Sequence, residues 1–517
     1  MARVELAHSA RRRPEGEAVG RPDDGARLAV TLHLRHPAEP DHAPGSAEDF
    51  AALAVPTTRR RLALERARLF APARAPLAEF AAQHGLRLGR LRATRRTVKL
   101  YGAAAQLSEA FGATLVAFEA EGRRFRARTG PLTAPDDLAP WIRAVVGFDT
   151  RAPSLRPASD PTDGLGLWPR EIAALYGLPA DAKATGQCIG VIAPGGGHLP
   201  TDLAAAAAGA GQVPPTAVVD QPASANRFGQ DDLADAELAI DLQVLAGVAA
   251  GAKLVAYFTG GHISDLAGAL HDAVFDTVNR PQVLCVSWGS SEDVWPDDVR
   301  LTVQAALRDA VRLKVAVVAA AGDYLATGGF TDGKAHVYHP ASSPYVLACG
   351  GTAPTLDAAG ARIVGEAVWN DGLAATGTGG GISDKHPVPA YQAALALPPS
   401  ANAGAPAGRG VPDVAAAASA LPGYSVILNG QRIGKAGTSA ATPLWAALLA
   451  LANARRASPL GLPHDVLYGA AGVCREITAG DNRYGGLGYD AGPGWNACTG
   501  LGVPNIAQVL DALAAAP

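Results

Sequence analysis

From about residue 165 onward, short apolar runs rich in β-branched residues alternate with long helical patterns. Runs that stay apolar on both faces, with helices between them, are typical of a mostly parallel sheet flanked by helices. Residues 370–435 are rich in Gly and Pro and predict loops and short strands around a site. We therefore predict an α/β domain over residues 165–517. Its expected strands lie at 188–194, 253–258, 282–289, 315–322 and 345–351, and its expected helices at 233–249, 264–278 and 297–313.

Residues 1–160 have shorter and more mixed patterns, which predict a small α+β domain. The Pro-rich stretch 152–164 is typical of a linker between this domain and the next. The expected elements are strands at 27–35 and 96–102, helices at 75–85, 106–112 and 137–147, and a hairpin over 113–129 that turns near Glu121 and Gly122.

The two parts of the chain differ in charge. Residues 1–160 contain 26 Lys and Arg against 18 Asp and Glu, a formal charge of +8, whereas the remainder carries −11. The Arg residues are interleaved with acids and lack the aromatic pattern of single-strand binders, so we expect no nucleic-acid partner. Opposite charges instead predict that the two parts dock on each other, and that docking weakens in acid as carboxylates lose their charge.

The sequence shows neither a targeting segment nor a cysteine motif. The N-terminus has no apolar run of signal-peptide length, and no segment approaches about 18 apolar residues without Gly or polar breaks. We therefore expect no recognisable signal peptide and no membrane association. The five cysteines are widely spaced and fit neither a zinc motif nor a dense disulfide framework.

Gly437, Thr438 and Ser439 run directly into an apolar helical pattern with Pro443 in its first turn. Ser439 is therefore expected at a helix N-terminus, where the helix dipole and backbone N–H groups favour an oxyanion. Taken alone, an N-cap serine without chemistry is the commoner role. A Ser-His-Asp triad does not fit, because no histidine lies in the His-Gly setting of the subtilisins.

Three carboxylates offer another way to activate this serine. Glu237 and Asp241 are four residues apart among apolar neighbours and share one face of the expected helix. Two carboxyls in such surroundings tend to share a proton, which raises one pKa and makes that group a usable acid or base. Asp323 follows the strand expected at 315–322, where a protonated carboxyl can donate to an oxyanion. Alone, its Gly-Asp sequence is simply a turn.

Together, Ser439 in GTS-x-x-x-P, the Glu237 and Asp241 pair, and Asp323 after AAAG resemble the sedolisin family of serine-carboxyl peptidases. The resemblance covers nearly the whole chain. It implies a subtilisin-like catalytic domain over 165–517, preceded by an activation propeptide over 1–160. Further stretches similar to the kumamolisin-like branch lie at 286–295, 340–352, 379–383, 408–415 and 492–504, and stretches similar to its propeptide lie at 96–102 and 126–130.

The resemblance implies that Ser439 is the nucleophile, Glu237 the general base, Asp241 a partner hydrogen-bonded to Glu237, and Asp323 the oxyanion stabiliser. It implies a secreted, monomeric, acid-acting endopeptidase that cleaves protein or peptide substrates and is made as an autoprocessed proenzyme inhibited by its own propeptide. Acid operation also follows from the chemistry, since a carboxylate base works where imidazole is protonated. Two alternatives stay open: a tripeptidyl-peptidase of the same family, and a catalytically weakened binding protein with the peptidase fold.

The resemblance also implies one Ca²⁺ ion near the C-terminus. The family has Asp at the first and last ligand positions, so Glu476 and Asn496 are departures that remove one formal charge. We expect a weakened ion site or a metal-free loop. The five positions that match the family's ligands are Glu476, Ile477, Gly492, Gly494 and Asn496.

Other departures lie close to the catalytic residues. Ala193 stands where the kumamolisin-like branch has a Glu that extends the carboxylate network, and Tyr324 and Leu325 replace the usual Ser-Gly after Asp323. None of them removes a catalytic group. We expect them to change the rate and the pH optimum.

Overall fold

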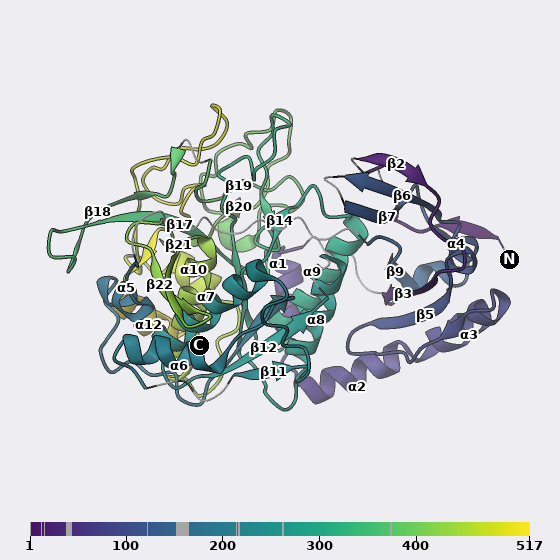
Figure 1. The fold of residues 1–517 in the computed structure, drawn as a ribbon, viewed down its shortest axis with the longest axis horizontal. Helices are drawn as coiled ribbons and strands as arrows, with labels where there is room; N and C mark the ends of the chain where they lie inside the picture. The colour runs from purple at the N-terminus through teal and green to yellow at the C-terminus, as the bar shows by residue number, and fades with distance from the viewer. Residues whose placement is uncertain are drawn as a thin grey trace.

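The computed structural model shows two domains side by side (Figure 1). The expected linker at 152–164 and the expected turn at Glu121 and Gly122 lie outside the described residues. The structure describes residues 2–11, 13–14, 16–37, 44–120, 123–150, 165–213, 215, 218–260, 263–372 and 375–516.

The larger domain is built on an eight-stranded sheet with the order β11-β12-β10-β13-β15-β17-β18, in which β21 also pairs with β17. Every neighbouring pair is parallel except β17 with β18, so the predicted mostly parallel sheet is confirmed. The strands are β10 (Cys188–Pro194), β11 (Val219–Gln221), β12 (Lys253–Thr259), β13 (Val283–Val286), β15 (Ala316–Ala320), β17 (Leu347–Leu356), β18 (Ile363–Val368) and β21 (Val414–Ala417).

Helices cover both faces of this sheet. In β10, Ile189 and Val191 face a core with α7, α10 and α12, whereas Ile192 faces a second core with α8 and α9. Apolar residues on both faces explain why the strands lack alternation. No helix within the described ranges is long and apolar enough to cross a membrane. The helices are α5 (Pro169–Leu175), α6 (Pro200–Gly209), α7 (Asp232–Val248), α8 (Leu266–Val274), α9 (Asp297–Arg312), α10 (Thr438–Asn453), α11 (His464–Gly469) and α12 (Ile506–Ala515).

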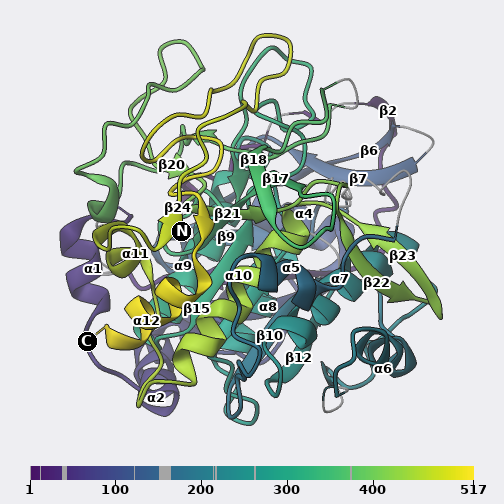
Figure 2. The same cartoon turned by 90° about the vertical axis from the view of Figure 1, so that its left-hand side faces the viewer.

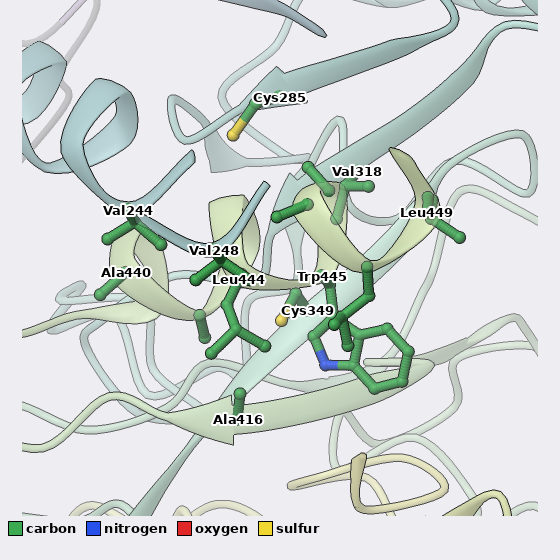
Figure 3. Packing of buried hydrophobic residues seen from close by; sticks show 14 of the residues in the cluster. Val244, Val248, Cys285, Val318, Cys349, Ala416, Ala440, Leu444, Trp445 and Leu449 are labelled. Atoms are coloured by element: carbon green, nitrogen blue, oxygen red, sulfur yellow. The ribbon is translucent and has the colours of Figure 1, made fainter. Parts of the chain in front are cut away.

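Helix α10 lies at the centre of the molecule (Figure 2) and is buried along its whole length. Leu444, Trp445 and Leu449 on α10 gather with Val244 and Val248 of α7 against the strands (Figure 3). The Trp445 indole also donates to the carbonyl oxygen of Ala415 at 2.9 Å. A helix packed on all sides holds its first turn in a fixed position, and this turn carries Ser439.

Among the described residues of the larger domain, eight short strands lie outside the main sheet, and four of them fall within the Gly- and Pro-rich residues 370–435, where short strands were predicted. Residues 424–435 form an antiparallel hairpin that leads into α10. These strands are β14 (Ser290–Ser291), β16 (Tyr338–His339), β19 (Gly381–Ile382), β20 (Gly410–Val411), β22 (Tyr424–Leu428), β23 (Gln431–Lys435), β24 (Cys474–Arg475) and β25 (Val503–Pro504).

The smaller domain has sheets with the orders β4-β5-β3-β9, β2-β6-β7 and β1-β8. Its strands are β1 (Arg3–Glu5), β2 (Glu17–Gly20), β3 (Arg27–Leu34), β4 (Arg87–Leu88), β5 (Thr97–Ala103), β6 (Thr114–Ala120), β7 (Arg123–Thr129), β8 (Thr133–Pro135) and β9 (Ile142–Val146), and its helices are α1 (Ala47–Leu53), α2 (Arg59–Leu69), α3 (Arg74–Gln83) and α4 (Ala104–Phe111).

The prediction of a helix over residues 137–147 was wrong. One 3-10 turn, Ala139–Trp141, is followed directly by strand β9, which pairs antiparallel with β3. Ile142 and Val145 enter the small domain's core, and β-branched residues favour this pleated, half-buried position. The pairing with β3, more than a hundred residues earlier in the chain, gave no signal in the local pattern.

Candidate active site

The turn into α10 places Ser439 at the second helical position. Gly437 before it has φ 126°, a conformation that a residue with a side chain rarely adopts. The Ser439 side chain is almost buried, and its hydroxyl lies 3.5 Å from the carbonyl oxygen of Ser287. The serine therefore combines a fixed position with the positive end of a buried helix dipole.

Helix α7 brings Glu237 into the same pocket as Ser439. Burial raises the pKa of the Glu237 carboxyl well above its usual range, and the nearby charge of Asp241 raises it further. A hydrogen bond with Ser439 acts in the opposite direction and favours the charged form. The structure therefore places Glu237 and Ser439 on the wall of one pocket.

Asp241 lies behind Glu237 and is fully buried. Its Oδ1 accepts hydrogen bonds from the Ser287 hydroxyl at 2.6 Å and from the Cys285 thiol at 3.5 Å. Burial raises the pKa of Asp241 to about 7, and these two bonds limit the rise. Oδ2 of Asp241 and Oε1 of Glu237 are buried, and neither has another hydrogen-bond partner among the described residues. Since Ser287 and Cys285 occupy Oδ1, Oδ2 of Asp241 is the oxygen left to carry a proton.

Asp323 sits just beyond β15, at the carboxyl edge of the sheet as predicted. Its Oδ1 accepts from the backbone N–H and from the hydroxyl of Thr438, both at 2.7 Å. Burial raises the pKa of Asp323, and the two Thr438 bonds oppose this rise. Since both bonds fall on Oδ1, Oδ2 is left to carry a proton beside the neighbouring Ser439.

One small pocket joins these groups. Glu237, Asp323 and Ser439 line it together, and Asp241 lies behind its wall. Sequence reasoning missed Ser287, Cys285 and Thr438 as hydrogen-bond partners of these carboxyls. Ser287 stands in the VSWG stretch at the end of β13, which was the one available signal. The other lining residues are Leu233, Ser287, Trp288, Gly289, Ala320, Gly322, Tyr338 and Thr438.

The positions expected to bind calcium come together only in part. The Asn496 amide nitrogen donates to the carbonyl oxygens of Ile477 and Gly492, at 3.1 and 3.3 Å. Glu476 is exposed. A hydrogen-bond donor that points at the expected ligand oxygens does not fit a bound cation.

The smaller domain docks on α8 and α9 of the larger one (Figure 1). Leu53 of α1 inserts into the core beneath these helices, and the Arg59 side chain donates to the carbonyl oxygens of Val274 and Pro281. Asp298 and Asp309 of α9 are fully buried at the contact. The ion pairs across it join Arg11 and Arg128 to Asp298, Arg66 and Arg96 to Asp309, Arg95 to Asp272, Arg308 to Asp49 and Arg312 to Glu65.

Comparison with known proteins agrees with this geometry. A family model described as "Subtilase family" matches residues 203–467, and one described as "Pro-kumamolisin, activation domain" matches residues 62–151. Kumamolisin of Bacillus sp. (strain MN-32) is 37% identical over 99% of this chain and 96% of its own length. A tripeptidyl-peptidase of Aspergillus fumigatus is 29% identical, covering 74% of this chain and 72% of the relative.

A solved structure of a serine-carboxyl proteinase has a similar fold. Pseudomonas sedolisin, a serine-carboxyl proteinase crystallised with two molecules of pseudo-iodotyrostatin, superposes with a TM-score of 0.59 and 27% identity, over 68% of this chain and 98% of that one. The expected subtilisin-like fold and activation domain are therefore confirmed. The chain belongs to the sedolisin family of serine-carboxyl peptidases, as a kumamolisin-like serine peptidase made with its own activation domain.

Proposed function

We propose that this peptidase acts in acid, with Ser439 as nucleophile, Glu237 as general base, Asp241 as its proton-sharing partner and Asp323 as oxyanion donor. The observation that carries the proposal is the single pocket lined by Ser439, Glu237 and Asp323, with Asp241 behind it. Among the described residues, no histidine lines this pocket. A carboxylate base is thus the available partner for the serine.

The chemistry follows from these positions. The Ser439 hydroxyl attacks the scissile carbonyl and transfers its proton to Glu237, while the protonated Asp323 donates to the developing oxyanion. Glu237 then gives the proton to the leaving amine, which leaves an acyl group on Ser439. Water hydrolyses this ester by the reverse proton route. Asp241 stabilises Glu237 by allowing one proton to be shared across the pair.

We propose endopeptidase activity on protein or peptide substrates. Support comes from coverage: kumamolisin matches 99% of this chain, whereas the tripeptidyl-peptidase of Aspergillus fumigatus matches 74%. The tripeptidyl-peptidase relative supports the second candidate, which trims three residues from a free N-terminus. A long internally quenched peptide with a blocked N-terminus separates the two: an endopeptidase cleaves it, and a tripeptidyl-peptidase requires the free amine.

Docking of the activation domain supports an acid-triggered proenzyme. Buried Asp309 faces Arg66 and Arg96 from the activation domain and His271 from α8. We propose that these ion pairs hold the inhibitory domain until acid weakens them, after which the chain cuts itself and functions as a secreted monomer. Mass analysis and size-exclusion chromatography during a pH drop should show a monomer that is shortened. A chain that never cuts, yet digests protein, would contradict the proenzyme.

The direct test of the proposed enzyme is digestion of a protein substrate at acid pH by the wild type and by Ser439→Ala. We expect complete loss of digestion and of self-processing in the variant, with an unchanged melting temperature. Equal digestion by both would show that Ser439 is not the nucleophile. Neither digestion nor self-processing by a folded wild type would favour the peptidase-fold binding protein.

A further inference from the structure

Asn496 makes an unusually complete set of hydrogen bonds in the loop before α12. Its side chain is nearly buried. The amide nitrogen donates to Ile477 and Gly492, and Oδ1 accepts from the N–H groups of Cys498 and Thr499, at 3.1 and 3.0 Å, and from the Thr499 hydroxyl at 3.1 Å. Both donors and the acceptor of one amide are therefore satisfied within the protein.

The orientation of this amide is set by its partners. Reversing it would point the NH₂ group at two backbone N–H donors and leave two carbonyl oxygens facing the amide oxygen. That arrangement loses four hydrogen bonds and brings like dipoles together. The nitrogen is therefore the atom that faces Ile477 and Gly492.

A calcium ion has the opposite requirement at this place. Ca²⁺ binds oxygen ligands about 2.3–2.6 Å away and favours negative carboxylates. The Ile477 and Gly492 carbonyls would be two such ligands, but here they accept hydrogen bonds from Asn496. The only oxygen of the Asn496 side chain points at backbone N–H groups instead.

We propose that the Asn496 amide replaces the calcium ion of this loop, so that this peptidase folds and works without calcium. An Asp at this position can only accept hydrogen bonds, so it would need a cation to bridge it to the two carbonyls. An Asn supplies the bridging donors itself. The substitution thus exchanges an ion for a neutral hydrogen-bond donor within the same chain.

The loop before α12 is hydrogen-bonded to the segment that follows Asp323 and to the start of β21. The Ala326 N–H, three residues after Asp323, donates to the carbonyl oxygen of Asn482 at 2.9 Å. Leu501 donates to the carbonyl oxygen of Asp413 at 2.8 Å, next to β21. A loop that opened would therefore loosen the turn that carries Asp323.

The test measures thermal unfolding of the full chain as Ser439→Ala, which prevents self-digestion, at neutral pH with EDTA or with millimolar CaCl₂. We expect identical melting temperatures in both, and no heat of Ca²⁺ binding by calorimetry. In Asn496→Asp we expect a lower melting temperature in EDTA and a rise of several degrees on adding Ca²⁺. Asn496→Ala is the matched control, which should be destabilised and unresponsive to Ca²⁺.

Two results would overturn the proposal. The first is a melting temperature of the Asn496 protein that falls in EDTA and is restored by Ca²⁺. The second is an Asn496→Asp protein as stable in EDTA as the parent, because the amide donors would then contribute nothing. The first measurement needs no variant at this position, so it decides the question even if Asn496→Asp does not fold.

Discussion

Asp241 is held by two side chains that the catalytic motif does not include. The buried Ala193 adds no charge where the kumamolisin-like branch was expected to have a carboxylate. Ser287 and Cys285 donate to Asp241 and lower its pKa against the effect of burial. The proton-sharing pair is therefore tuned here by neutral donors.

Removing the hydroxyl in Ser287→Ala should raise the pKa of Asp241 further, because the largest opposing bond is lost. The pair then reaches its basic form only at higher pH, so the acid limb of kcat/KM should move upward by about one pH unit. Ser287→Thr keeps the hydroxyl and is the matched control. An unchanged acid limb in Ser287→Ala would remove Ser287 from the positioning of Asp241.

The protonation of Asp323 should determine how kcat falls on the alkaline side of the pH profile. Its pKa is raised, so it can stay protonated and donate over the acid range, and it loses this role as pH rises. Asp323→Ala should lower kcat by about 10²–10³-fold. Asp323→Asn keeps a donor at every pH, so it should retain more activity and lose the dependence on this group at high pH. Equal kcat values for the two variants would contradict oxyanion donation.

Local motifs in the sequence singled out Ser439, Glu237 and Asp323, and the structure brings these three residues to one pocket. The sequence could not predict that Oδ1 of Asp241 is occupied by Cys285 and Ser287. These residues lie more than forty positions from Asp241, and the contact depends on how β13 packs against α7. The replacement of calcium by Asn496 likewise depends on the direction of one amide, which composition does not reveal.

At the scale of elements, α9 is the surface on which the activation domain docks. Burial raises the pKa of Asp309, but Arg66, Arg96 and His271 outweigh burial and hold it well below its usual range. The docked pKa is depressed, so Asp309 stabilises docking above about pH 4 and this contribution is lost as pH falls further. The pKa of Asp298 is shifted in the opposite direction: burial keeps it raised despite the nearby charges of Arg11 and Arg128. The contribution of Asp298 to docking is therefore not lost in acid. Of the two buried acids on α9, Asp309 is therefore the one whose contribution to docking is lost in acid.

Asp309→Asn leaves Arg66 and Arg96 without a buried counter-charge, which weakens a contact by about 3–5 kcal/mol in comparable cases. We expect self-processing to begin at higher pH than in the wild type, measured as the fraction of shortened chain against pH. Asp297→Asn on the same helix is the matched control, since Asp297 is half-exposed and forms an ion pair with Arg300 of its own helix. The same pH midpoint in all three proteins would contradict the role of Asp309.

Local periodicity predicted α7, α9, β10 and β12 close to their observed bounds, since each is long or apolar enough to show its own period. It gave no expectation for the short parallel strands β11 and β21. It failed at β9, where pairing with β3 decides the structure. It also missed α1 and α2: Leu53 of α1 packs into the core of the other domain, and Arg59 of α2 donates to the carbonyl oxygen of Val274 there. Elements that exist through distant contacts carry little local signal.

At the scale of the whole molecule, several buried acids change the response of stability to pH. Burial raises the pKa of Glu292 to about 7, although Ser383 and the Asp384 N–H donate to it. Burial also raises the pKa values of Glu237, Asp241 and Asp323. A raised folded pKa gives stability that is complete below about pH 4 and is lost as pH rises through the folded value.

The molecule should therefore unfold at lower temperature at pH 8 than at pH 5. Glu292→Gln, which lies outside the catalytic pocket, should flatten this dependence, since one raised acid of this size accounts for a change on the order of 3 kcal/mol. Melting curves of the Ser439→Ala chain and of its Glu292→Gln form, taken from pH 4 to pH 8, provide the measurement. A higher melting temperature at pH 8 would show that the acids with lowered pKa, such as Asp309 and Asp413, dominate.

The central claim is that a carboxylate takes the serine's proton. The most direct measurement is kcat/KM at pH 4 for Glu237→Gln against the wild type, on one internally quenched peptide, with melting temperature as the check on folding. Glutamine keeps the size of the side chain and cannot accept a proton. We predict a loss of about 10³-fold or more with the fold intact. A folded Glu237→Gln enzyme that cleaves at the wild-type rate would contradict the account.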